Sequence, residues 1–126
     1  MPIEAKRLVL YIAGPMRGYD DYNFPAFFKA EKILHKLGHV TVNPARHDKE
    51  LGFNEKTDTA DQEYLRTSMA WDLGQVCRSD GVVVLAGWHK SRGARAEVAA
   101  ARAVGLPVFI IHHRDGVAHL REAIYV

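Results

Sequence analysis

Leu8-Val9-Leu10-Tyr11-Ile12-Ala13-Gly14-Pro15 is a continuous apolar run that ends in a Gly-Pro pair. A run of this kind, with apolar residues on both faces, is typical of a strand buried between two layers and followed by a turn. Residues 81–86 read Gly-Val-Val-Val-Leu-Ala and form the most apolar stretch of the chain. Both stretches are therefore expected to be buried strands.

Outward from these two stretches, strands and helices alternate. The apolar pattern predicts strands over residues 8–13, 40–42, 81–86 and 107–111. The spacing of apolar residues and the capping signals predict helices over residues 24–37, 61–78 and 94–104, and a last short helix from 115 or 116 to 123. Residues 44–60 are polar and irregular, so we expect a long loop of the lid or binding kind there.

This β-α-β-α-β-α-β-(α) order predicts one α/β domain over residues 1–126, with a Rossmann-like (flavodoxin-like) parallel sheet. The expected sheet has four to five strands in the order 2-1-3-4(-5), with helices on both faces. Ligands of such sheets bind at the carboxyl ends of the strands, where the strand order reverses. Residues 14–18 and 87–93 are the two loops that meet at this point, so position alone nominates them as a site.

Composition limits the class of protein. Hydrophobic residues make up 48% of the 126 residues, and the net charge is only +2. Seventeen basic residues are interspersed with 15 acidic ones without a run of five like charges, which argues against polymeric nucleic acid as a partner. No apolar run would span a bilayer, and residues 1–7 lack a signal-peptide core. A single cysteine, Cys77, favours the cytoplasm, and no metal-ligand spacing is found.

Two carboxylates fall on faces that should be buried. Glu97 lies next to Val98 on the inward face of the helix over 94–104, and Asp72 lies three residues after Met69 on the apolar stripe of the preceding helix. A buried carboxylate needs a partner or a purpose. A pair of acids serves glycosidic cleavage, but each could equally be a structural group that satisfies a buried partner.

The two loops carry residues suited to an anion. Gly14-Pro15-Met16-Arg17-Gly18 offers glycines for close backbone approach and an arginine that can bind a phosphate with two hydrogen bonds, although it matches neither GxGxxG nor the Walker pattern. Ser91-Arg92-Gly93-Ala94 opens a helix, where free N–H groups and the helix dipole attract anions. An ordinary turn and an ordinary N-cap are the structural alternatives. Trp88 could stack on a base or cover the end of the sheet.

Three motifs in register over residues 8–111 resemble the nucleoside 2-deoxyribosyltransferase superfamily. They are Leu10-Tyr11-Ile12-Ala13-Gly14-Pro15-Met16-Arg17-Gly18, then Trp71-Asp72-Leu73 with Ser79-Asp80-Gly81-Val82-Val83-Val84-Leu85, and finally Ser91-Arg92-Gly93-Ala94-Arg95-Ala96-Glu97. The resemblance implies a deoxyribosyltransferase-like domain and a nucleophile at Glu97. It also implies that Asp72 contacts the sugar or assists the leaving base, and that Tyr11 lies near the nucleophile.

One position separates branches of this superfamily. Transferases carry an aspartate six residues before the nucleophile, whereas the 2′-deoxynucleoside 5′-monophosphate N-hydrolases carry a serine there as a phosphate ligand. This chain has Ser91, and Arg17-Gly18 matches the Arg-Gly of the hydrolases, but Pro15 replaces their serine. The resemblance and the two loops together give the expected substrate-binding set: Gly14, Met16, Arg17, Gly18, Trp88, Ser91 and Gly93.

The expected function is hydrolysis of the base–sugar bond in a (deoxy)nucleoside 5′-monophosphate, with no metal and no cofactor. Base exchange between nucleosides and non-catalytic nucleotide binding are the two alternatives. The resemblance further implies a cytoplasmic homodimer whose neighbouring subunit closes the site. The sequence shows no preference for a particular base.

Overall fold

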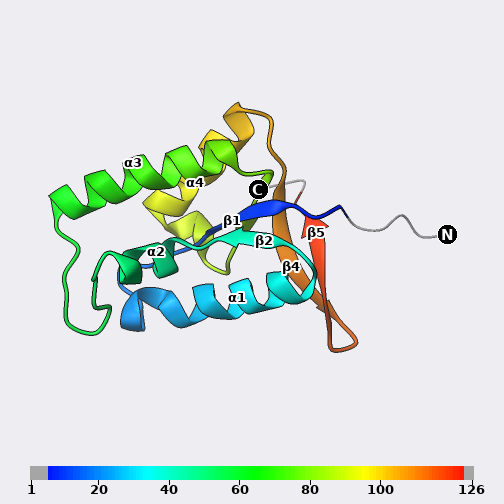
Figure 1. The fold of residues 1–126 in the computed structure, drawn as a ribbon, viewed down its shortest axis with the longest axis horizontal. Coiled ribbons are helices and arrows are strands. Elements are labelled where there is room, and N and C mark those ends of the chain that lie inside the picture. Colours follow the sequence, from blue (N-terminus) through cyan, green and yellow to red (C-terminus); the bar gives the residue numbers. More distant parts are fainter. Residues whose placement is uncertain (1–5, 124–126) are drawn as a thin grey trace.

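A five-stranded sheet in the order β2-β1-β3-β4-β5 runs through the structure. The computed structural model describes residues 6–123 (Figure 1). The strands are β1 (Val9–Ala13), β2 (Val40–Val42), β3 (Gly81–Val84), β4 (Val108–Arg114) and β5 (Val117–Glu122). The first four strands are parallel, and β5 is antiparallel to β4. The predicted strand order and fold class are confirmed.

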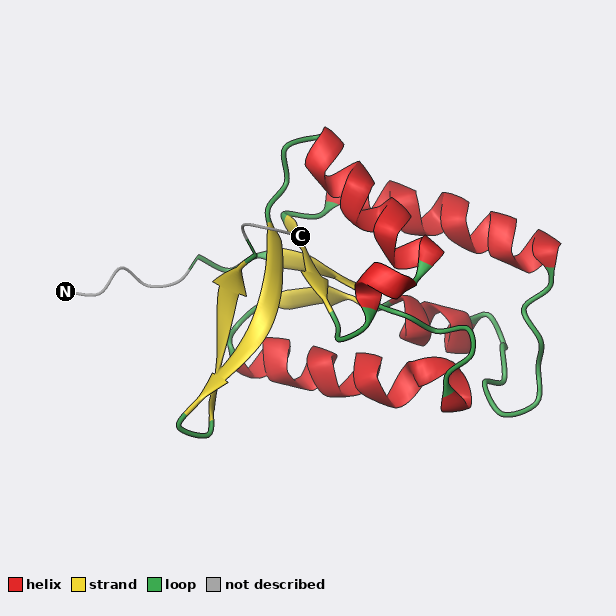
Figure 2. Ribbon diagram, turned by 180° about the vertical axis from the view of Figure 1, so that it is seen from behind, coloured by secondary structure: helices red, strands yellow, loops and turns green. Residues whose placement is uncertain are grey.

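Alternating residues of β1 face opposite layers of the molecule. Leu10 and Ile12 lie in one core cluster, with α1 (Phe24–Lys36) and the start of α2 (Pro44–Glu50). Tyr11 and Ala13 lie in the other cluster, with the helices α3 (Gln62–Arg78) and α4 (Arg92–Ala103). Figure 2 shows the two helical layers on either side of the sheet. Because side chains alternate along a strand, the phase of β1 directs Tyr11 toward α3 and α4.

The α4 helix packs closely on the sheet because its inward side chains are small. Ala94, Val98 and Ala101 are buried, whereas Arg95 and Arg102 are exposed. The Ser91 Oγ accepts a 3.1 Å hydrogen bond from the Ala94 N–H, which is the expected N-cap. Two single-turn 3₁₀ helices, η1 (Asp20–Asn23) and η2 (Trp88–Lys90), precede α1 and α4.

The prediction of a continuous loop over residues 44–60 was wrong, because its first part is the helix α2. The Asn43 side chain caps this helix by accepting hydrogen bonds from the backbone N–H groups of Ala45 and Arg46, at 3.0 and 3.4 Å. Arg46 forms an ion pair with the buried Glu31 of α1. Helix α2 is therefore held against α1 by this ion pair as well as by the buried Ala45 at its start.

The prediction of a last short helix was also wrong, because residues 117–122 form the strand β5. Asp115 and Gly116 both have positive φ, at 53° and 77°, which suits a tight two-residue hairpin turn. The turn continues β4 to Arg114, three residues beyond its predicted end at 111, and pairs His112 with His119 across the hairpin.

Two further properties concern residues 6–123 as a whole. No helix in this part of the chain is long and apolar enough to cross a membrane. The described residues also contain no group of three or more His, Cys, Asp or Glu side chains arranged to hold a metal ion. Cys77 is exposed on α3.

Candidate active site

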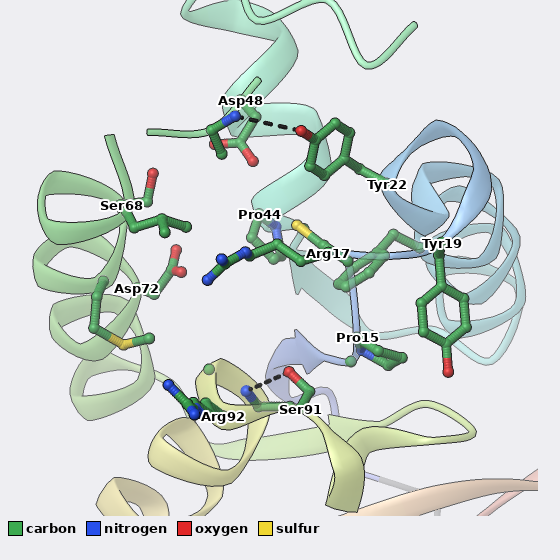
Figure 3. Close-up of a pocket in the computed structure, with 18 of the residues that line it drawn as sticks. Pro15, Arg17, Tyr19, Tyr22, Pro44, Asp48, Ser68, Asp72, Ser91 and Arg92 are labelled. Carbon is green, nitrogen blue, oxygen red and sulfur yellow. Dashed lines mark hydrogen bonds between the residues drawn. The ribbon is translucent and has the colours of Figure 1, made fainter. Parts of the chain in front are cut away.

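A cleft of about 790 Å³ opens at the carboxyl ends of β1 and β3. Its walls come from the loop 14–18, from α2 and α3, and from the start of α4. Cavities of this size hold small organic ligands. The position is the one expected for a parallel sheet at its switch point, and Figure 3 shows the lining side chains converging from these elements.

Glu97 lies on the buried floor of the cleft, and Tyr11 lies behind it, outside the cleft lining. The Tyr11 hydroxyl donates a 2.8 Å hydrogen bond to Oε2 of Glu97, which is only 5% exposed. Strand β1 positions Tyr11 because its odd-numbered side chains face α4. Helix α4 positions Glu97 because its carboxylate lies three residues after the buried Ala94.

Asp72 of α3 completes an acid pair with Glu97. Its side chain points into the cleft (Figure 3). Burial raises the pKa of Glu97 well above its usual value, and the nearby charge of Asp72 raises it further. Burial likewise raises the pKa of Asp72 to about 6. Two acids whose pKa values are raised in one cleft are suited to hold a single proton between them near neutral pH.

Tyr11 stays protonated beside this pair. Burial raises the pKa of its phenol well above the usual value, and the charges of Glu97 and Asp72 raise it further. The phenol is therefore a permanent hydrogen-bond donor to Glu97. This bond lowers the pKa of Glu97 and partly offsets the effect of burial.

The end of the cleft at the start of α4 is cationic. Lys90 and Arg92 lie there with Ser91 and Gly93, and Arg17 lines the cleft from the loop after β1. Within residues 6–123 the ion pairs are Arg46–Glu31, Lys49–Glu55 and Lys56–Asp21, so none of the three cleft cations is neutralised by a carboxylate. Figure 3 shows Arg17 reaching into the cleft and Arg92 beside Ser91. Free cations at a helix N-terminus are suited to an anion.

The loop after β1 is fixed by close packing and by strain. A Cβ on Gly14 would lie 2.9 Å from the Cβ of Leu85, so only glycine lets this loop approach the end of β3. The Asn23 side chain donates a 2.9 Å hydrogen bond to the Pro15 carbonyl instead of capping α1. Residues 21–23 all have positive φ, a strained backbone of the kind that gathers at functional sites.

Most of the site residues expected from the sequence lie in the cleft lining: Gly14, Met16, Arg17, Gly18, Asp72, Ser91, Gly93 and Glu97. Tyr11 and Trp88 do not line it, although Tyr11 is joined to the lining by its hydrogen bond to Glu97. The indole packs partly buried against the core cluster of the α3 and α4 face, which corresponds to its structural interpretation. The placement of Trp88 at the base therefore has no support from the geometry.

Sequence reasoning missed the second wall of the cleft. Asp48, Tyr22, Phe53 and Tyr64 line it, from α2, η1, the segment after α2 and the start of α3. No short motif marks these residues. The signal that could have located Asp48 is the pair Asn43-Pro44. An asparagine followed by a proline favours the start of a helix, and one side of a helix over residues 44–50 would then face inward.

The fold and the cleft define an α/β protein with a cavity at the switch point of a mainly parallel sheet, lined by both acidic and cationic side chains. The family model described as "Domain of unknown function (DUF4406)" matches residues 8–110, and the chain belongs to this family.

A solved structure of a 2-deoxyribosyltransferase from the psychrotolerant bacterium Bacillus psychrosaccharolyticus has a similar fold. The two chains superpose with a TM-score of 0.60 at 20% sequence identity, over 81% of this chain and 70% of the other. A search of curated proteins finds no significant relative. The structural similarity agrees with the fold predicted from the sequence.

Proposed function

We propose that the protein is an N-glycosidase that hydrolyses the base–sugar bond of a (deoxy)nucleoside 5′-monophosphate. The observation that carries this proposal is the polarity of one cleft. The buried Glu97 and the half-buried Asp72 face the cleft, and cations that have no carboxylate partner among residues 6–123 line it as well. A nucleotide has the complementary shape, because its phosphate lies one sugar away from the bond that is cleaved.

Glu97 is the proposed nucleophile. Its carboxylate attacks C1′ through an oxocarbenium-like transition state, while the C1′–N bond breaks and its electron pair goes to the base. Asp72 gives its proton to that base nitrogen. Water then attacks C1′ of the glycosyl-enzyme, returns a proton to Asp72 and frees Glu97. The products are a free base and a sugar 5-phosphate.

The acid pair is suited to these separate roles. Near neutral pH the pair holds one proton, and the positive charge that develops at C1′ favours the ionised form of Glu97. The proton then resides on Asp72, where it is available to the leaving base. Tyr11 is a positioning residue, because its hydroxyl fixes the Glu97 carboxylate at 2.8 Å without itself ionising.

The cationic end provides the proposed phosphate site. Arg17, Arg92 and the first-turn amides of α4, with the Ser91 hydroxyl, would hold the phosphate by charge-assisted hydrogen bonds. Binding energy at the phosphate would then position C1′ against Glu97. The Ser91 Oγ keeps its capping bond to Ala94 while its own proton can be donated.

The test uses chromatography to measure the release of free base from a panel of ribo- and deoxyribonucleoside 5′-monophosphates. Glu97→Gln keeps the shape of the side chain and should lower kcat at least a thousandfold. Glu63→Gln, on the exposed start of α3, is the matched control and should leave the rate unchanged. Retained activity in Glu97→Gln would exclude this carboxylate as the nucleophile.

Base exchange is the second candidate, because the structural neighbour is a 2-deoxyribosyltransferase. Adding a different free base to the assay distinguishes the two. Exchange would yield a new nucleoside or nucleotide, whereas hydrolysis would yield only the sugar phosphate. Tight nucleotide binding without any release of base would instead support a non-catalytic module.

The resemblance to the superfamily also carries the proposal of a cytoplasmic homodimer. Sedimentation equilibrium of the purified chain tests the assembly. A monomer at assay concentrations that still releases base would show that no second subunit is needed to close the site.

A further inference from the structure

Asp48 is a buried acid that the mechanism above does not use. It lies on α2, is 8% exposed and lines the cleft. Its Oδ1 accepts a 2.9 Å hydrogen bond from the Tyr64 hydroxyl. This is its one side-chain hydrogen bond to residues 6–123, and none of their ion pairs involves it. Figure 3 shows the carboxyl group facing the cavity.

Aromatic rings line the same part of the cleft as this carboxyl group. Phe53 contacts Tyr22 edge-on, with ring centroids 5.2 Å apart, and stacks on Tyr64 at 5.0 Å. The Tyr22 hydroxyl accepts a 3.3 Å hydrogen bond from the Ala60 N–H, which ties the segment after α2 to η1. An apolar, flat-sided wall of this kind suits a planar heterocycle.

The order of groups along the cleft matches the order of parts in a nucleotide. Figure 3 shows Asp48 and Tyr22 at one end, Ser91 and Arg92 at the other, and Asp72 between them. The charge of Asp48 raises the pKa of Asp72, after the larger effect of burial, so the two carboxyls lie within electrostatic reach. With phosphate at Ser91 and C1′ near Asp72 and Glu97, the base extends toward Asp48.

A carboxylate at this place discriminates between bases by hydrogen-bond polarity. One oxygen is occupied by Tyr64, and the carboxylate can only accept further hydrogen bonds. An exocyclic amino group would donate such a bond, whereas a carbonyl oxygen at the same ring position would meet the carboxylate as a second acceptor. Leaving buried polar groups unpaired makes such selection strong.

We propose that Asp48 is the residue that selects the base, and that the preferred substrates carry a base with an exocyclic amino group, namely cytosine, adenine or guanine. The inference rests on the proposed function, because it takes the phosphate and sugar positions from it. It deepens that function by naming the substrate class.

Three nucleotide pairs test this selection with the wild-type protein. The pair dCMP and dUMP, and the pair dAMP and dIMP, differ by an amino group in place of an oxo group. The pair dGMP and dIMP differs only by the 2-amino group. We expect the amino member to have the higher kcat/KM, by tenfold or more, in at least one pair. Equal kcat/KM within all three pairs would overturn the proposal.

Asp48→Asn then tests the residue itself. The amide keeps the shape and can accept from Tyr64 through its oxygen, but its NH₂ group now donates into the cleft. In the pair that the wild type distinguishes, the ratio of kcat/KM for the amino over the oxo member should fall at least tenfold. Glu50→Gln makes the same charge change on the exposed side of α2 and should leave the ratio unchanged. An unchanged ratio in a folded Asp48→Asn variant would exclude Asp48 as the selecting residue.

Tyr64→Phe is a second variant, which retains the carboxylate but frees Oδ1. It should reduce the same ratio less than Asp48→Asn does, and it gives a reading if Asp48→Asn fails to fold. An unchanged ratio in Tyr64→Phe would count against selection by a carboxylate that Tyr64 holds in place.

Direct binding separates this inference from the proposed reaction. If no monophosphate releases its base, calorimetric Kd values for the same pairs still report the selection. Tighter binding of the amino members by the wild type, with loss of that preference in Asp48→Asn, would support the base site while the hydrolase assignment fails. Equal Kd values within every pair, or no binding of any monophosphate, would overturn the base site as well.

Discussion

The Tyr11 hydroxyl lies 2.8 Å from Oε2 of Glu97, a contact that joins the first strand to the last helix of the structure. The two residues are 86 positions apart in sequence. Tyr11 is fully buried, so its phenol has few other partners, and the bond constrains the carboxylate in both position and protonation. Removing the Tyr11 hydroxyl oxygen therefore tests how this contact affects the reaction.

Tyr11→Phe deletes that atom. Loss of a hydrogen bond to a charged group, equivalent to about 1.5–3 kcal/mol, should lower kcat by about tenfold to a hundredfold with little change in KM. Because the bond lowers the pKa of Glu97, its removal should raise that pKa, and the acidic limb of the pH–rate profile should move to higher pH. A lower rate with an unmoved acidic limb would indicate a general loss of structure.

Local patterns of apolar residues made this contact predictable in part. Residues 8–13 and 81–86 identified the central strands, and helical spacing placed Glu97 and Asp72 on inward faces. The capping of α4 by Ser91 followed from its position before the helix. These features depend on residues close together in the sequence, so local patterns report them.

The second wall of the cleft was not predictable in the same way. Helix α2 buries mainly Pro44, Ala45 and Asp48, so it lacks the apolar stripe that marks a helix. An ion pair between Arg46 and Glu31 joins it to α1, and no short pattern indicates that contact. The hairpin was missed for a different reason, because the Asp-Gly turn signal at residue 115 was interpreted as a helix start.

Asp72→Asn should make the protein more stable at neutral pH while reducing its activity. Burial raises the Asp72 pKa to about 6 in the folded state, above its value in the unfolded chain. The folded state therefore binds the proton more tightly, and stability falls as pH rises from about 4 to about 6. The variant avoids this cost and should gain on the order of 1–3 kcal/mol above pH 6.

Urea unfolding at pH 4, 5.5 and 8 checks this sign. The difference between variant and wild type should be smallest at pH 4, where Asp72 is still protonated in the folded state and little of the cost has developed, and largest at pH 8. Glu50→Gln, an exposed carboxylate on α2, should show no such trend. A variant that is less stable than the wild type at pH 8 would mean that the Asp72 charge makes favourable contacts in the folded protein.

Arg17→Ala should separate nucleotides from nucleosides. Its guanidinium reaches the cleft without a carboxylate partner among residues 6–123, so its removal leaves no buried charge unpaired. We expect KM for monophosphates to rise about tenfold to a hundredfold, as for one lost charge-assisted contact. Activity on the corresponding nucleosides should not change.

The matched control is Arg95→Ala, which removes an exposed arginine on the outer side of α4. Arg92→Ala should act like Arg17→Ala, because both are cations that line the cleft. Equal losses on nucleosides and monophosphates in the cleft variants would place the phosphate elsewhere. The salt dependence of KM gives an independent reading, because a phosphate site weakens as ionic strength rises.

Gly14→Ala and Gly74→Ala should change stability in opposite directions. A Cβ at Gly14 would meet the Leu85 side chain at 2.9 Å, so the ends of β1 and β3 must separate. Overpacking of this kind costs about 1–3 kcal/mol, and displacement of the loop 14–18 should lower kcat/KM as well.

Gly74 lies within α3, and the nearest atom to its Cβ would be the Arg78 guanidinium at 4.0 Å. Alanine there should stabilise the helix by about 0.5–1 kcal/mol without affecting activity. Thermal unfolding with kinetics on the same samples checks both, and a Gly14→Ala protein as stable and active as the wild type would show that this close approach is not required.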